Sequence, residues 1–331
     1  MLTNGLIAGV GQRQLVQRLG KIVQTTIKTA VSFTGVGLHS GREIRMTVQP
    51  ASAEYGIWFR RVDIANGDTM VPARWDAVVP ASLCTRVENQ SGVSVSTIEH
   101  LMAALAGCGI HNALIEIDGP EVPILDGSSA QFVAAFVARG IRRLPAPVRA
   151  LEILKPVEVR VGDAVARLEP SSDFEISFQI DFSDEAIGSQ TKTLNMANGA
   201  FIRELCDSRT FCRNSDVTAM RANGLALGGT MENAVVIDGA DVLSPGGLRH
   251  SDEAVRHKML DAVGDLALAT CPILGRYTGV RAGHALTNKL MRALFADPDA
   301  FRTVMCDSAR AAKLPGSGIG QADIAGLQKA A

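Results

Sequence analysis

The sequence predicts an α+β protein made of two similar units, each a sheet layered against helices. Three observations carry this prediction. Apolar and polar residues alternate over residues 174–182, which is the period of a strand with one buried face. Apolar residues recur at helical spacing in 96–106 and 251–272. The order of strands and helices before Pro145 and Pro147 is repeated after them.

The chain of 331 residues is long for a single hydrophobic core, so we expect two domains. Pro145 and Pro147 mark the expected linker between them. The first residues contain a short apolar stretch that is broken by glycines and follows no basic region, which does not predict a signal peptide. The expected organisation is an N-terminal extension at 1–24, a first α+β domain at 25–145, a second at 150–300 and a C-terminal tail at 301–331.

The composition argues against several classes of function. The chain is 47% hydrophobic and 20% charged, as in ordinary soluble proteins. A formal net charge of -1 gives no general attraction to nucleic acid or to an anionic membrane. No apolar run reaches the roughly 18 residues that a membrane span needs. The six cysteines form no CxxC pair, which predicts reduced thiols in the cytoplasm instead of disulfides or cysteine-bound zinc.

The first unit is predicted to combine a sheet with two helices. A glycine-rich turn carries His39, which we expect to be a solvated loop histidine, and period-two residues follow at 44–48. The helix at 96–106 opens with Ser96-Thr97-Ile98-Glu99, which matches a capping box. Glu99 therefore has a structural explanation that requires no catalytic role. A strand and a helix are then expected at 113–117 and 132–140.

The second unit repeats this order. Its expected strands and short helices lie at 157–161, 174–182, 200–206, 216–224 and 234–237. The helix at 251–272 has Ser251 as its expected N-cap and Pro272 as its stop, with Val255, Met259, Val263 and Leu266 facing inward. A last helix begins at Gly283-His284 and buries Leu286, Leu290, Met291 and Leu294. The weak patterning after residue 301 predicts a loose tail.

A candidate metal site lies on the helix at 251–272. His257 and Asp261 are four residues apart and share a face, so an imidazole and a carboxylate can converge on one ion. Asp265 continues the same line one turn further. An ordinary contact on the helix surface is the alternative. A metal would need a third protein ligand, and among the six histidines His100 and His284 stand in the most distinctive segments.

Six segments of the chain resemble the signatures of one enzyme family. They are Ser96-Thr97-Ile98-Glu99-His100-Leu101, Pro123-Ile124-Leu125-Asp126-Gly127-Ser128, Ser208-Arg209-Thr210-Phe211, Leu227-Gly228-Gly229, the run from Val255 to Asp265, and Gly283-His284-Ala285-Leu286. In this order they resemble UDP-3-O-acyl-N-acetylglucosamine deacetylase, which performs the committed step of lipid A synthesis in Gram-negative bacteria. The resemblance covers about 25–300 and places the active site between the two units.

The resemblance implies a catalytic metal. His100 would join His257 and Asp261 around zinc, with water in the open position, which is a known hydrolytic arrangement. Ferrous iron suits the same ligands, and the sequence does not choose between the two metals.

The resemblance also implies the acid–base groups. Glu99 corresponds to the general base, His284 to the second acid–base group, and Asp265 to the carboxylate that orients His284. Either His284 or protonated Glu99 could supply the proton that the departing amine needs. The substrate would be a UDP-linked acylated amino sugar, handled by a monomer with at most peripheral membrane contact and no nucleic-acid polymer as partner.

The expected substrate contacts are Thr210 for the oxyanion, Phe211 for the sugar or uridine, Lys258 near the sugar nucleotide, and Leu83 and Cys84 near the cleft, where Cys84 could also be simple packing. The insert after Thr210-Phe211 is implied to form the acyl passage, with Val217, Met220, Leu225, Leu227 and Met231. Arg213 and Met231 stand where the family often has an aromatic residue, so the preferred acyl length stays open.

Two other functions remain possible at the sequence level. One is a zinc amidohydrolase that acts on a different N-acetylated sugar nucleotide. The other is a non-catalytic paralogue that senses the ligand. Loss of Glu99, His284 or a metal ligand would favour the second, and all five residues are present.

Overall fold

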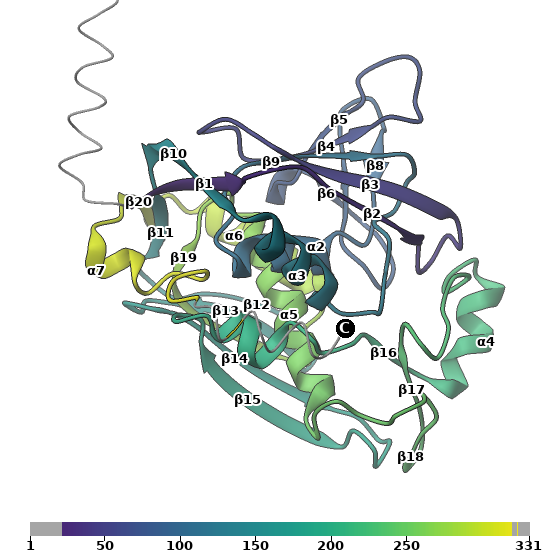
Figure 1. Cartoon of the computed structure of the whole chain (residues 1–331). Helices are drawn as coiled ribbons and strands as arrows, with labels where there is room; N and C mark the ends of the chain where they lie inside the picture. The colour runs from purple at the N-terminus through teal and green to yellow at the C-terminus, as the bar shows by residue number, and fades with distance from the viewer. Residues whose placement is uncertain (1–21, 320–322, 324–331) are drawn as a thin grey trace, which may run out of the picture.

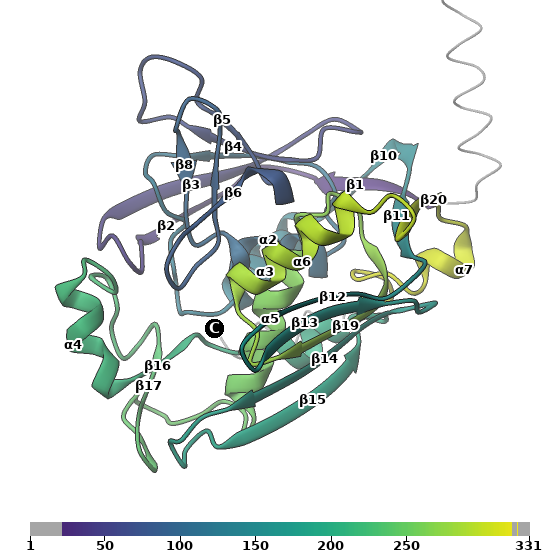
Figure 2. The same ribbon diagram turned by 180° about the vertical axis from the view of Figure 1, so that it is seen from behind.

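The structure is a computed structural model that describes residues 22–319 and 323. Most of the expected N-terminal extension and much of the expected tail therefore lie outside the described residues. Two sheets enclose a layer of helices, with the sheet of the first half on one side and the sheet of the second half on the other (Figures 1 and 2). This is the α+β architecture that the sequence predicts.

The first half is built on a five-stranded sheet in the order β2-β3-β9-β4-β5. In its strand β3, Ile44, Met46 and Val48 are fully buried and alternate with more exposed residues, as the period-two pattern predicts. The five strands are β2 (Val31–Val36), β3 (Glu43–Pro50), β4 (Ile57–Arg61), β5 (Met70–Pro72) and β9 (Ala113–Ile117).

Two smaller sheets complete the first half. One holds β6 (Val78–Val79), β7 (Arg86–Glu88) and β8 (Ser94–Val95), and the other pairs β1 (Val23–Ile27) with β10 (Ile141–Pro147). The expected linker prolines, Pro145 and Pro147, are part of β10 and not of a loop. A two-stranded ladder has free edges, and an edge strand accepts proline because it need not donate on its outer side.

The second half is built on a seven-stranded sheet. Its main path is β12-β13-β19-β11-β20, with β14 beside β19 and β15 beside β14. These strands are β11 (Arg149–Ile153), β12 (Val157–Val161), β13 (Ala164–Glu169), β14 (Phe174–Asp181), β15 (Ser189–Asn195), β19 (Ile273–Val280) and β20 (Phe301–Met305). Strand β20 corrects the expectation of a loose tail, because it runs antiparallel to β11. Backbone pairing with a neighbouring strand leaves little trace in a side-chain pattern.

The helices pack between the sheets. They are α2 (Glu99–Gly107), α3 (Ala130–Arg139), α5 (Glu253–Ala267) and α6 (His284–Ala296). Helices α2 and α5 touch closely, because Gly264 of α5 lies against the backbone of Glu99, where a Cβ atom would come within 2.8 Å of the Glu99 carbonyl carbon. The inward residues predicted for α5 and α6 are all buried.

Two helix boundaries differ from the predictions. Helix α5 spans Glu253–Ala267, shorter at both ends than the expected 251–272, and its N-cap is Asp252 instead of Ser251. Helix α2 begins at Glu99 and has no side-chain cap, so the capping box is wrong. Thr97 adopts a left-handed conformation (φ 55°) that turns the chain just before the helix and takes Ser96 out of the cap position.

A segment outside the two main sheets contains β16 (Phe211–Arg213), α4 (Asn214–Ala222), β17 (Val235–Asp238) and β18 (Asp241–Val242). A short helix, α7 (Ser308–Ala311), follows β20 and is the last labelled element in chain order. Within 22–319 and 323, every helix is too short or too polar to cross a membrane. All six cysteines are free.

In the described part of the chain, each strand ladder joins strands of the same half. We therefore propose that the halves are two units, 25–145 and 150–300, that meet between β10 and β11. Their helices nevertheless share one continuous hydrophobic core, which includes Leu101 of α2, Val263 of α5 and Leu290 of α6. The shared core fixes the position of α2 relative to α5.

Candidate metal centre

The described structure brings His100, His257 and Asp261 together at the contact between α2 and α5. Their nearest ligand atoms all lie within 4.8 Å of one another. Oδ1 of Asp261 lies 3.5 Å from Nε2 of His100 and 3.3 Å from Nε2 of His257. All three residues are buried. The i, i+4 pair on α5 has thus acquired the third candidate ligand from the first turn of α2.

The pattern of protonated and unprotonated atoms in this cluster leaves a place for a cation. Nδ1 of His257 donates to the carbonyl oxygen of Ser208 at 3.0 Å. Burial lowers the pKa of His257 to about 4, so its ring is neutral and its Nε2 carries a lone pair. That lone pair faces Oδ1 of Asp261, which is buried and has no hydrogen-bond partner. Two acceptors that face each other in a buried site fit a metal ion between them.

Lys258 contributes positive charge on the outer side of the cluster. Its Nζ lies 2.7 Å from Oδ2 of Asp261. Although burial opposes the ionised form, His257 and Lys258 hold the pKa of Asp261 well below its ordinary value. Asp261 is therefore a carboxylate, with Oδ2 paired to the lysine and Oδ1 left for another cation.

Glu99 lies beside the cluster as a buried carboxyl group. Its Oε2 accepts a hydrogen bond from the backbone N–H of Thr85 at 3.0 Å, and its Oε1 lies 3.7 Å from Nε2 of His284. Burial raises the pKa of Glu99 above its ordinary value. The side chain thus faces the site. It does not cap α2, although capping was the structural role that the sequence pattern predicted.

His284 is held by a carboxylate on α5. Its Nδ1 donates to Oδ2 of Asp265 at 2.9 Å, and the other carboxylate oxygen of Asp265 accepts from the hydroxyl of Thr85. Burial acts to lower the pKa of His284, but the carboxylates of Asp265 and Glu99 outweigh it and raise the pKa to about 9. The imidazole is therefore protonated at neutral pH.

A cavity of about 860 Å³ opens onto this cluster and draws its walls from both halves of the chain. Each expected substrate contact lines it: Leu83, Cys84, Thr210, Phe211 and Lys258. From the expected acyl passage, Val217, Met220 and Met231 also line it, whereas Leu225 and Leu227 do not. Leu227 is 54% exposed.

His39 is the cavity residue that the sequence analysis misjudged. It lines the cavity, and its Nε2 is buried without a hydrogen-bond partner, so it is not a solvated loop histidine. The buried carboxylate of Glu121 fixes its turn by accepting the backbone N–H groups of His39 and Ser40, each at 2.8 Å. The glycines around His39 signalled a tight turn, but not what that turn would pack against.

The fold and the site together define a class of protein. A possible metal site of two imidazoles and one carboxylate, next to a second carboxyl group and a protonated imidazole, is typical of metal-dependent hydrolases.

The chain belongs to the family of UDP-3-O-acyl N-acetylglycosamine deacetylases, whose family model matches residues 24–296. It is 52% identical over 279 residues to the UDP-3-O-acyl-N-acetylglucosamine deacetylase of Phenylobacterium zucineum, which covers 84% of this chain and 95% of that protein. It is 47% identical over 285 residues to the enzyme of the same name from Anaeromyxobacter sp. (strain Fw109-5), covering 86% and 92%. The relative in Shewanella sp. (strain W3-18-1) is 46% identical over 285 residues, covering 86% and 93%. The protein is accordingly a hydrolase of the deacetylase type.

Proposed function

We propose that this protein hydrolyses the acetamide of UDP-3-O-(3-hydroxyacyl)-N-acetylglucosamine with the help of zinc, in the committed step of lipid A biosynthesis. The products are acetate and UDP-3-O-(3-hydroxyacyl)-glucosamine. The observation that carries the proposal is the buried Oδ1 of Asp261, which faces the unprotonated Nε2 of His257 and has no hydrogen-bond partner. The names of the relatives support the choice of substrate.

His100, His257 and Asp261 are the proposed zinc ligands. Zinc held by these residues would polarise a carbonyl group and lower the pKa of bound water to about 7. Ferrous iron accepts the same nitrogen and oxygen ligands, so metal analysis of the protein isolated from its own cells distinguishes the two ions.

Glu99 is the proposed general base. It accepts the proton of the attacking water, and the hydrogen bond from Thr85 N–H holds one of its oxygens in place. Because burial raises its pKa, the carboxylate is a better proton acceptor than an exposed glutamate. Its other oxygen, Oε1, lies 3.7 Å from Nε2 of His284.

His284 is the proposed acid. With a pKa of about 9, it enters the reaction protonated, stabilises the oxyanion together with the hydroxyl of Thr210, and gives its proton to the departing amine. Asp265 orients the ring through its hydrogen bond with Nδ1. Two groups in one site thus have opposite tasks, because burial dominates at Glu99 and neighbouring carboxylates dominate at His284.

The cavity offers surfaces for the rest of the substrate. We assign Lys258 and Phe211 to the sugar nucleotide, Leu83 and Cys84 to the neighbouring wall, and the apolar side chains Val217, Met220 and Met231 to the acyl chain. A water-soluble nucleotide at one end of the substrate and free cysteines in the protein are in keeping with a cytoplasmic location, and we propose that the protein acts there as a monomer.

Release of free amine from the UDP-linked substrate tests the proposal. Activity should vanish when zinc is chelated and return when zinc is restored. His257→Ala should lose metal, and His284→Ala should keep metal and lose rate. His250→Ala is the matched control, because His250 pairs with Asp207 and does not line the cavity.

Two outcomes would change the assignment. Equal rates on UDP-N-acetylglucosamine without the 3-O-acyl group would point to another N-acetylated sugar nucleotide. A metal-loaded protein that binds the substrate and releases no amine would point to a sensing role.

A further inference from the structure

The peptide bond between Ser208 and Arg209 is held at both of its polar ends by α5. Its carbonyl oxygen accepts from Nδ1 of His257 at 3.0 Å. Its N–H donates to Oε1 of Glu253, also at 3.0 Å. Glu253 and His257 are four residues apart on α5, so they lie on one face of the helix, one turn from each other. One peptide group therefore connects a carboxylate to a proposed zinc ligand.

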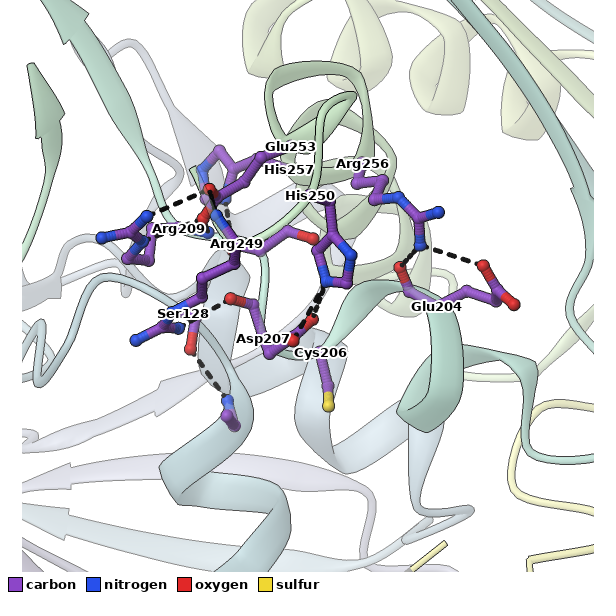
Figure 3. A network of polar contacts seen from close by, with 12 residues as sticks. Ser128, Glu204, Cys206, Asp207, Arg209, Arg249, His250, Glu253, Arg256 and His257 are labelled. Atoms are coloured by element: carbon purple, nitrogen blue, oxygen red, sulfur yellow. Dashed lines mark hydrogen bonds and ion pairs between the residues drawn. The ribbon is translucent and has the colours of Figure 1, made fainter. Parts of the chain in front are cut away.

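Glu253 is buried, and both of its carboxylate oxygens accept hydrogen bonds from neighbouring groups. It is 1% exposed, and its two oxygens accept four hydrogen bonds. Besides the N–H of residue 209, the donors are Nε and Nη2 of Arg209 and the backbone N–H of Arg249, at 2.9, 3.1 and 2.7 Å. Figure 3 shows Arg209 directed at Glu253, next to His257. These donors outweigh the effect of burial and lower the pKa of Glu253, so it is ionised.

We propose that Glu253 is a positioning residue for the metal centre and acts on His257 through the Ser208–Arg209 peptide. This inference rests on the proposed role of His257 as a zinc ligand. A carboxylate that accepts the N–H polarises the peptide and increases the negative charge on its carbonyl oxygen. The stronger acceptor fixes the Nδ1–H tautomer and the ring orientation of His257, and it makes Nε2 a better donor to a metal. In many zinc proteins a carboxylate binds the ligand histidine directly; here a peptide group lies between them.

The neighbouring residue Asp252 provides a matched control. It belongs to the same end of α5 and pairs with Arg256 and Lys192, without contact to the peptide. Asp252→Asn therefore removes one negative charge and two ion pairs near the helix terminus and leaves the link to His257 intact. Glu253→Gln keeps the size of the side chain and removes the charge from the link.

The experiment measures zinc affinity by chelator competition and the Nδ1–H proton resonance of His257 in the metal-free protein. Glu253→Gln should weaken zinc binding about 10- to 100-fold, the usual effect of losing such a partner, and move the resonance upfield. Asp252→Asn should change neither quantity. The double variant Glu253→Gln with Arg209→Met, which leaves no unpaired buried cation, should show the same loss and guards against misfolding of the single variant.

Unchanged affinity and an unchanged resonance in folded Glu253→Gln would overturn the inference, as would an equal loss in Asp252→Asn. If the wild-type chain bound no zinc at all, the proposed function would fail instead. The resonance of the metal-free protein would still decide whether Glu253 acts on His257.

Discussion

Replacing Gly264 with alanine tests whether the contact between α2 and α5 sets the geometry of the metal centre. A Cβ atom at this position would lie 2.8 Å from the carbonyl carbon and 3.0 Å from the Cα of Glu99. Carbon atoms in contact prefer about 3.5–4.0 Å, so the helices must separate by about 1 Å. His100, on α2, would then move by a similar distance from His257 and Asp261, on α5.

The expected effects on rate and stability differ in size. A misplacement of about 1 Å costs roughly 100-fold in rate, so kcat/KM should fall by about that factor. Overpacking costs about 1–3 kcal/mol, and the better helix propensity of alanine returns about 1 kcal/mol, so the free energy of unfolding should fall by no more than about 2 kcal/mol. Amine release measures kcat/KM, chelator competition measures the zinc affinity, and denaturant unfolding measures the free energy of unfolding.

Gly107→Ala is a control that overpacks α2 at a position away from the metal centre. Its Cβ would meet the ring of Phe201, 2.7 Å from Cε1, at the end of α2 that is remote from Glu99. It should destabilise the protein without a large loss of zinc affinity. If Gly264→Ala kept full zinc affinity and rate, the helix contact would not control the site, and the reasoning above would be refuted.

Four further predictions concern acid–base behaviour, metal linkage and the acyl passage. The rate should fall as pH rises through about 9, where His284 loses its proton, and Asp265→Asn should move this limb towards the ordinary histidine pKa of about 6.5 in a pH–rate profile. Folding raises the pKa of His284, so its contribution to stability is complete below about pH 6.5 and disappears as pH rises through about 9. Urea unfolding of the wild type and of His284→Gln at several pH values measures this contribution. Zinc at 100 times its Kd should stabilise the folded chain by about 2.7 kcal/mol, and an equal melting temperature with and without chelator would contradict a folded-state site. Met231→Trp should shorten the preferred acyl chain with little change in zinc affinity, whereas Met305→Trp, on a strand away from the cavity, should leave chain preference unchanged.

Local spacing made much of the fold readable. Residues 44–48 and 174–182 alternate because a strand turns each successive side chain to the opposite face. Residues 44–48 and 174–181 do lie in strands with the expected buried face. The apolar stripe of α6 was equally direct, since a helix repeats its faces every 3.6 residues. Where a distant partner competed with a local signal, the prediction was wrong.

Two of those failures have clear physical causes. Ser96 and Glu99 carry the pattern of a capping box, but Glu99 accepts from Thr85 N–H instead, and the left-handed Thr97 removes Ser96 from the cap position. Strand β20 exists because its backbone pairs with β11. Neither the competing donor nor the pairing strand leaves a mark in the adjacent sequence.

The sequence by itself determined the family, through six ordered motifs, and the convergence of His257 with Asp261, because i, i+4 geometry is fixed within one helix. The tertiary structure decided how His100 meets them, through the close packing of α2 on Gly264. It also decided that Glu253 reaches His257 through the Ser208–Arg209 peptide. Covalent geometry fixes short distances along a chain, whereas the packing of the whole core fixes distances between remote segments, and no local pattern specifies that packing.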